Sequence, residues 1–292
     1  MKHIPKKRFG QNFLTDRDMI AACVTAIRPQ ADDLMVEIGP GLGALTQPLL
    51  HALDRLHVVE LDRDIVQWMQ NHYPPDRIAI HNVDALKFDF ASIPAASQPR
   101  MIARRQGGGE ETVHEVRREA ADAANNASAS AGKRLRVVGN LPYNISTPIL
   151  FHLLDNLAHI ADMHFMLQKE VVERMVAAPS TPAYGRLSVM LQYRLQMEYL
   201  FTVPPQAFEP PPKVESAFVR AVPHATLPHV AQDEQLLAKV VTSAFGQRRK
   251  TLRNTLKGLL DDAGFAALGI DPQLRAENLG VREFVAIANH LA

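Results

Sequence analysis

Three features of the 292-residue sequence predict an α/β fold that ends in a small all-α domain. Residues 34–94 alternate short β-branched runs with helical patterns, which is typical of βαβ units and a parallel sheet. A glycine-rich turn follows the first of these runs, as it does in Rossmann-like sheets that bind nucleotides. After about Pro223 the strand signals stop and apolar residues recur at helical spacing. We therefore expect a Rossmann-like domain over residues 1–223 and a helical C-terminal domain over residues 224–292.

The elements of the first domain follow in order along the chain. Parallel strands are predicted over Leu34–Ile38, Leu56–Leu61, Ile78–His81, Val137–Gly139 and Met163–Gln168. A helix is predicted over residues 44–53, and Asp62 is well placed to cap the helix that carries Ile65, Trp68 and Met69. Two later runs suit an antiparallel pair at the end of the sheet, Tyr199–Val203 and Ser216–Val222.

Helices are predicted in the second domain over Asp233–Phe245, Lys250–Leu260 and Arg282–Leu291. An odd segment over residues 95–133 separates the third and fourth strands. It contains three consecutive glycines and a tract rich in Ala, Asn and Ser. Few of its residues could anchor a core, so we interpret it as a surface insertion that is disordered or partly helical, with a helix over Glu110–Ala124.

Composition is ordinary for a soluble protein, with 47% hydrophobic and 22% charged residues, but the basic residues are unevenly placed. Lys2, Lys6, Lys7 and Arg8 precede any acid in the N-terminal arm, residues 1–15. A second window without Asp or Glu lies between Glu234 and Asp261 and holds Lys239, Arg248, Arg249, Lys250, Arg253 and Lys257. Such clusters on a chain of net charge +1 suggest a surface that faces a polyanion, the alternative being a solvated face.

Cysteine content and hydropathy bear on the compartment. The single cysteine, Cys23, excludes an intrachain disulfide, fits a reducing compartment, and lies among apolar residues that predict a core position. The basic N-terminus lacks the apolar run of a signal peptide, and no segment reaches transmembrane length. These observations predict a cytoplasmic protein.

The glycine-rich turn bears on the kind of ligand. Glycines at 39, 41 and 43 would let the backbone approach a ligand at the carboxyl end of the first strand. Their G-x-G-x-G spacing differs from the dinucleotide fingerprint, which disfavours NAD and FAD. No G-x-x-x-x-G-K-[ST] motif follows, which disfavours ATP hydrolysis.

Polar residues also follow the next strands. Glu60 ends the second strand about 20 residues beyond the glycine turn, where an acid can bind both ribose hydroxyls. Asp84 follows the third strand and could accept a hydrogen bond from a bound adenine. Each acid alone would more commonly be a helix cap or a solvated charge, but their order at successive strand ends indicates a nucleoside cofactor.

A turn of sequence Asn140-Leu141-Pro142-Tyr143 follows the fourth strand. The Asn140 side-chain carbonyl and the Leu141 backbone carbonyl could both accept hydrogen bonds from one exocyclic amine, because Pro142 shapes the turn and donates nothing. Tyr143 offers a flat face for a base. A turn with a buried tyrosine is the structural alternative. Beside a nucleoside cofactor, this turn predicts methyl transfer to a base amine.

The chain resembles the small-subunit ribosomal RNA adenine dimethyltransferases over nearly its whole length. The matching blocks are Lys7–Leu14, Val36–Gly43, Val59–Asp62, Val138–Ser146, Leu167–Val171, Ala183–Arg186, Phe208–Ala217 and Phe245–Asn254. The first of these is more specific than any general methyltransferase motif. Only the 95–133 insertion looks foreign to the family.

The resemblance implies a class I methyltransferase sheet that binds S-adenosyl-L-methionine and no metal. Asn12 and Leu14 would close over the cofactor, and the loop of Gly39 and Gly41 would pass its methionine portion. Glu60 would bind the ribose, Asp84 the adenine, and Asn140 would sit where cofactor and target meet. Phe208 would sandwich the target base against Tyr143. The alternatives are a helix-capping role for Asn12 and a plug over the core for Phe208.

The activity implied is dimethylation of two adjacent adenosines in the 3′-terminal hairpin loop of small-subunit ribosomal RNA, with a role in small-subunit biogenesis. The protein would act as a monomer, without a membrane. Phosphate contacts are expected from Lys6, Lys7, Arg8, Arg248, Arg249, Lys250 and Arg253, with Arg249 and Arg253 on one helical face. The alternatives are an adenine methylase acting on another nucleic acid and a non-catalytic assembly factor that binds ribosomal RNA.

Overall fold

The computed structural model describes residues 11–93 and 133–292. Three of the predicted RNA-binding residues, Lys6, Lys7 and Arg8, lie outside the described residues. So does the predicted insertion except for its last residue, Lys133, which forms an ion pair with Asp32.

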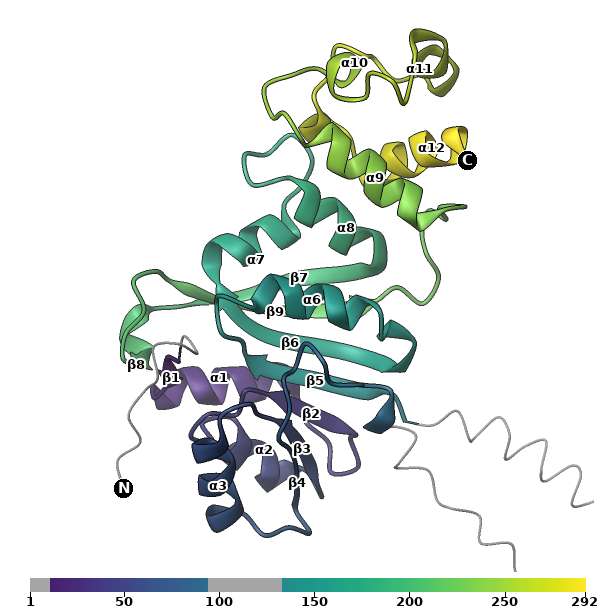
Figure 1. Ribbon diagram of the computed structural model, residues 1–292. Coiled ribbons are helices and arrows are strands. Elements are labelled where there is room, and N and C mark those ends of the chain that lie inside the picture. Colours follow the sequence, from purple (N-terminus) through teal and green to yellow (C-terminus); the bar gives the residue numbers. More distant parts are fainter. Residues whose placement is uncertain (1–10, 94–132) are drawn as a thin grey trace, which may run out of the picture.

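A seven-stranded sheet forms the centre of the structure, with strand order β4-β3-β2-β5-β6-β9-β7 (Figure 1). Five strands are parallel, as predicted: β2 (Met35–Ile38), β3 (Leu56–Val59), β4 (Ile78–His81), β5 (Leu135–Asn140) and β6 (Ile160–Gln168). The antiparallel pair at the edge is also confirmed, as β7 (Leu195–Val203) and β9 (Ser216–Pro223). Three of these strands, β5, β6 and β7, begin two to four residues earlier than the sequence indicated.

The strand order creates a switch point beside β2. The chain first moves outward from β2 through β3 to β4, and then returns to place β5 on the other side of β2. The connections that leave β2 and β5 therefore diverge to opposite sides, which opens a crevice at the carboxyl ends of these strands. The glycine turn after Ile38 and the turn that begins at Asn140 meet at this crevice.

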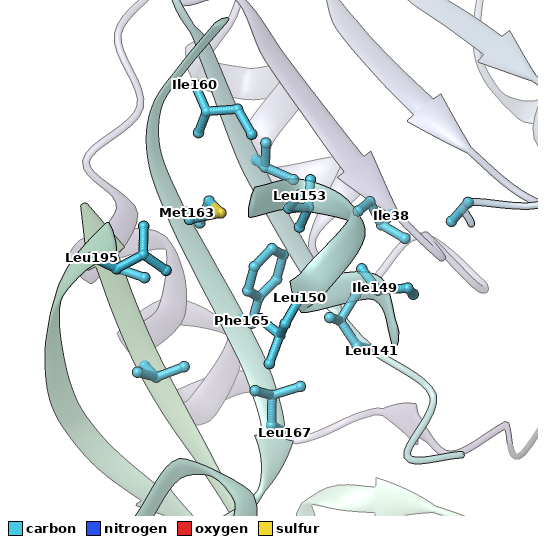
Figure 2. Close-up of a cluster of buried hydrophobic side chains, with 14 of the residues drawn as sticks. Ile38, Leu141, Ile149, Leu150, Leu153, Ile160, Met163, Phe165, Leu167 and Leu195 are labelled. Carbon is cyan, nitrogen blue, oxygen red and sulfur yellow. The ribbon is translucent and has the colours of Figure 1, made fainter. Parts of the chain in front are cut away.

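Helices cover both faces of the sheet. On one face, α1 (Arg17–Ile27), α2 (Thr46–Ala52) and α3 (Arg63–His72) bury Cys23, Leu49 and Met69 in a shared hydrophobic cluster. Asp62 caps α3 as predicted, accepting a hydrogen bond from the Asp64 amide. On the other face, α6 (Ser146–Leu154), α7 (Lys169–Val176) and α8 (Arg186–Arg194) pack on a second cluster. Figure 2 shows part of that cluster, in which Leu141 lies beside Ile149.

The last helices gather at one end of the molecule, beyond α8 (Figure 1). They are α9 (Glu234–Ala244), α10 (Leu252–Thr255), α11 (Asp262–Leu268) and α12 (Val281–Leu291). They share a third hydrophobic cluster that also takes Val189 and Tyr193 from α8. The division at residue 223 stays a prediction, because this cluster draws on residues from both sides of it.

The predicted helix over Lys250–Leu260 is wrong, since α10 spans only Leu252–Thr255. Leu252, Leu256 and Leu260 are buried, so the apolar spacing correctly indicated burial. The backbone amides of Leu252 and Arg253, however, bond to the chain at residues 272–274 instead of to a preceding helical turn.

A small two-stranded sheet joins the N-terminal arm to the proline-rich segment near residue 210. It pairs β1 (Phe13–Leu14) with β8 (Phe208–Glu209), placing Leu14 opposite Phe208. Short 3₁₀ helices complete the described elements at η2 (Leu157–His159), η3 (Pro205–Ala207) and η4 (Ala276–Asn278). Among the described residues, no helix combines the length and the apolar character that crossing a membrane requires.

Candidate active site

A cavity of about 800 Å³ opens at the carboxyl ends of β2, β3, β4 and β5. Its volume is within the range of pockets that bind small ligands. Every described residue that the sequence analysis placed at the cofactor or the amine lines this cavity, except Phe208: Asn12, Leu14, Gly39, Gly41, Glu60, Asp84, Asn140, Leu141, Pro142 and Tyr143. The structure thus brings together residues separated by as many as 131 positions in the sequence, from Asn12 to Tyr143.

The glycine turn lies between β2 and the N-terminal arm and lines the cavity. Gly39 and Gly41 have φ values of 66° and 55°, in the left-handed region that glycine adopts without strain. A Cβ atom on Gly41 would lie 2.9 Å from Cδ1 of Phe13. The absence of a side chain at Gly41 therefore lets the arm pack directly against the turn.

Glu60 follows β3 and is only 9% exposed. Its Oε1 accepts a hydrogen bond of 2.7 Å from the Asp62 amide, which orients the carboxyl group. Burial raises the pKa of Glu60, although backbone hydrogen bonds oppose this shift. The side-chain amide of Asn82 donates to the Glu60 backbone carbonyl at 2.8 Å, so the loops after β3 and β4 are tied together.

Asp84 lies in that second loop. Its Oδ1 accepts a hydrogen bond of 3.0 Å from the Leu86 amide. The carboxyl group is thereby held in place while Asp84 lines the cavity.

Glu37 is a cavity residue to which the sequence analysis assigned no role. It lies in β2, is 2% exposed, and accepts a hydrogen bond of 2.6 Å from the Thr46 hydroxyl. Burial raises the pKa of Glu37 to about 7, and the neighbouring Glu60 contributes in the same direction. A signal was present in the sequence, because a carboxylate inside the apolar strand Met35–Ile38 is costly to bury unless it has a partner.

The turn after β5 is tied to the rest of the protein at each of its chemically important residues. The Asn140 side-chain amide donates to the Asn12 backbone carbonyl at 3.0 Å, and the Leu141 amide donates to the Met166 carbonyl at 3.1 Å. The hydroxyl oxygens of Tyr143 and Ser216 lie 2.6 Å apart and share a hydrogen bond. Leu141 is 1% exposed, and its side chain anchors the turn in the hydrophobic core (Figure 2). Leu141 also lines the cavity.

Phe208 is placed differently from the other predicted residues. It is 3% exposed, belongs to the same hydrophobic cluster as Leu14, and is not among the residues that line the cavity. This burial matches the alternative interpretation, in which the Phe208 side chain closes over the hydrophobic core. Its role in stacking the target base stays a prediction.

The predicted basic surface lies at the helical end of the molecule. The statement that Arg249 and Arg253 share a helical face is wrong, because α10 begins at Leu252 and Arg249 lies in the preceding turn. Arg253 forms an ion pair of 3.0 Å with Asp262, and Arg248 donates to the Pro182 carbonyl at 2.6 Å. Lys250 is exposed.

Arg248 and Arg249 line a second cavity of about 280 Å³ together with Arg275 and the Ser180–Pro182 loop. Glu277 also lines it, 3.6 Å from the Arg248 guanidinium, so the lining of this cavity holds three arginines and one carboxylate. The sequence analysis missed Arg275 because it lies between Asp271 and Glu277, outside any basic run. Within residues 11–93 and 133–292, no group of three or more His, Cys, Asp or Glu could hold a metal ion.

The sequence is similar to those of known proteins along its whole length. The family model described as ribosomal RNA adenine dimethylase matches residues 2–292. The ribosomal RNA small subunit methyltransferase A of Methylobacillus flagellatus is 66% identical over 292 residues, covering 100% of both chains. The protein of the same name from Chromobacterium violaceum is 54% identical, covering 99% of this chain and 97% of its own.

Two solved structures share the fold. A dimethyladenosine transferase from Plasmodium falciparum has a TM-score of 0.65 at 18% identity, covering 94% of this chain and 95% of its own. The 23S rRNA methyltransferase ErmE also has a TM-score of 0.65, at 20% identity, covering 96% of this chain and 99% of its own.

Proposed function

Because this chain belongs to the ribosomal RNA adenine dimethylase family, we propose that it dimethylates the N6 amines of two adjacent adenosines in small-subunit ribosomal RNA. The methyl donor is S-adenosyl-L-methionine, and the target is the 3′-terminal hairpin loop. The observation that carries this proposal is that one cavity is lined by the glycine turn, by Glu60 and Asp84, and by the Asn140–Tyr143 turn. Identity of 66% to a small-subunit enzyme supports the choice of RNA, which the fold alone does not, since a 23S rRNA enzyme matches equally well.

The cavity fits a cationic nucleoside cofactor. Glu37 and Glu60 place two buried carboxyl groups at its wall, and a bound ammonium or sulfonium would favour their ionised forms. Glu60 would bind the ribose and Asp84 the adenine, while Gly39 and Gly41 give the methionine portion room. Asn12 and Leu14 close the site from the arm. The cofactor supplies an electrophilic methyl group, so the protein needs to align and activate a nitrogen rather than provide a strong base.

Asn140 and Leu141 supply that activation. The Nδ2 of Asn140 donates to the arm, which leaves its Oδ1 as the acceptor of the side chain. With the Leu141 backbone carbonyl it would accept both hydrogens of the target amine, favouring a pyramidal nitrogen whose lone pair can attack. The same two oxygens would stabilise the positive charge that develops on that nitrogen. Neutral Asn140 does this without a buried anion.

Tyr143 provides the surface on which the flipped adenine stacks, and an RNA loop makes flipping inexpensive because its bases are poorly stacked. Phosphate contacts come from Arg248, Arg249, Lys250 and Arg253 at the helical end, joined by Arg275. Lys6, Lys7 and Arg8 of the arm are proposed to add to them. We place the protein in the cytoplasm, as a monomer, where immature small subunits are its partners.

Methyl transfer from labelled cofactor to immature small subunits, large-subunit RNA and duplex DNA tests the proposal. Labelling of adenosines in small-subunit RNA alone is the expected result, with mass spectrometry showing dimethyladenosine. Labelling of DNA alone would overturn it. Subunit binding without any labelling would favour the alternative of a non-catalytic assembly factor.

A further inference from the structure

Tyr143 is held both at its backbone and at the end of its side chain. Its backbone carbonyl accepts a hydrogen bond of 3.1 Å from the Ser146 hydroxyl at the start of α6. Its phenol oxygen lies 2.6 Å from the hydroxyl oxygen of Ser216, the first residue of β9. Tyr143 therefore spans from the end of β5 to the start of a strand two positions further along the sheet.

Ser216 is well fixed itself. It is fully buried and pairs with Gln168 of β6 on one side and with Val203 of β7 on the other. A hydroxyl on an interior strand held from both sides has little freedom to move. Burial raises the pKa of Tyr143, so its phenol stays protonated and the hydroxyl pair persists at neutral pH.

A stacking surface works best if its position is set before the base arrives, because the cost of ordering it is then already met in folding. A tyrosine ring with a free hydroxyl end could rotate about its side-chain bonds. The Ser216 hydroxyl restricts rotation about the Cα–Cβ bond, because it holds the phenol oxygen at the end of the ring furthest from the backbone. The Asn140–Asn12 hydrogen bond likewise fixes the orientation of the Asn140 side chain, and with it the acceptor oxygen at the start of the turn.

We propose that Ser216 is a positioning residue for the methyl-transfer reaction, holding the Tyr143 ring at the place where the target adenine stacks. This inference rests on the proposed function, since it assigns a role within the same site. Ser216 does not touch the substrate; it acts entirely through the Tyr143 hydroxyl.

The test is a double-mutant cycle with Y143F, S216A and the double variant, measured as methylation of immature small subunits. Each single change removes one hydroxyl and no ring or backbone atom, and thermal unfolding confirms that the variants fold. We expect each single variant to lower kcat about tenfold, the upper end of what one hydrogen bond contributes. The KM for subunits and the dissociation constant for the cofactor should stay within about twofold of wild type, because neither hydroxyl contacts those ligands.

The decisive measurement is the double variant. If Ser216 acts only through Tyr143, the double variant loses the same factor of about ten as either single variant. Multiplication of the two losses, to about one hundredfold, would show that Ser216 acts by another route and would overturn the inference. So would wild-type kcat in either single variant. A wild-type protein that fails to label subunits would overturn the proposed function as well, whereas an active wild type with multiplied losses overturns this inference alone.

Discussion

The side-chain amide of Asn140 donates a hydrogen bond of 3.0 Å to the backbone carbonyl of Asn12, joining the last residue of β5 to the N-terminal arm. Under the proposed function this contact connects two roles, because the arm would close the cofactor cavity and Asn140 would face the target amine. It also determines which atom of the amide is the acceptor. The arm thereby orients the Asn140 side chain.

Replacing Asn140 by alanine should abolish most activity. Loss of the acceptor oxygen is expected to lower kcat by about one hundredfold or more, as removal of a single transition-state hydrogen bond does in other enzymes. Binding to immature subunits, measured by co-sedimentation, should be unchanged because the basic surface is remote. Simultaneous loss of binding and methylation would show instead that Asn140 maintains the structure.

Replacing Asn140 by aspartate tests the link to the arm. Aspartate retains an acceptor but cannot donate to the Asn12 carbonyl, and its charge would repel that oxygen. We expect weaker cofactor binding by calorimetry in N140D than in N140A, since alanine removes the hydrogen bond without adding repulsion. Equal affinities in the two variants would argue against the link.

Glu37 should make stability depend on pH. Its pKa is raised to about 7 from an ordinary value of 4.5, so between these values the folded protein keeps a proton that the unfolded chain has lost. The free energy of unfolding should therefore fall as pH rises from 4.5 to 7 and level off above 7. Urea denaturation at pH 5 and at pH 7.5 measures this difference. The E37Q variant keeps an oxygen that can accept the hydrogen bond from Thr46, but it cannot titrate. The free energy of unfolding should therefore depend much less on pH in this variant, and an unchanged dependence would show that other groups cause it.

The glycine turn can be tested with a matched pair of alanine variants. Both Gly41 and Gly258 have positive φ, of 55° and 85°, but only Gly41 has a neighbour at the position of a Cβ atom. G258A should cost about 1 kcal/mol of stability from backbone strain alone and leave cofactor binding intact. G41A should carry the same backbone strain and in addition displace Phe13. We expect this displacement to weaken cofactor affinity by roughly tenfold or more. Equal cofactor affinity in the two variants would mean that the arm adjusts freely.

Arg249 and Arg253 should contribute unequally to RNA binding. Arg253 is engaged by Asp262, whereas among the described residues Arg249 has no ion-pair partner. R249Q should lower the affinity for subunit RNA and reduce the slope of log affinity against log salt by about one. R253Q should have a smaller effect. The control is R63Q on α3, at the opposite end of the molecule in Figure 1, which should leave the slope unchanged. An R249Q slope equal to wild type would contradict the assignment.

The structural features that were predicted correctly are those determined by residues close together in the sequence. Asp62 could be identified as a cap because an acid precedes a helical pattern, and Gly41 as part of a turn at the carboxyl end of the first strand because the spacing of glycines is local. The wrong helix over Lys250–Leu260 shows the limit of this approach. Its leucines indicate burial, but the partners of its backbone amides come from residues 272–274 and leave no local signal.

By itself, the sequence determined the family, the succession of the seven central strands along the chain, and a set of cofactor- and amine-binding residues that all line the cavity except Phe208. It could do so because β-branched runs, caps and glycine spacing act over short range. Only the tertiary structure decided which of those residues meet. It buried Phe208 against Leu14, engaged Arg253 with Asp262, and added Glu37 and Ser216 to the site. These contacts depend on strand register and on packing between segments far apart in the chain, where the physical determinant is a distance in space and not a spacing in sequence.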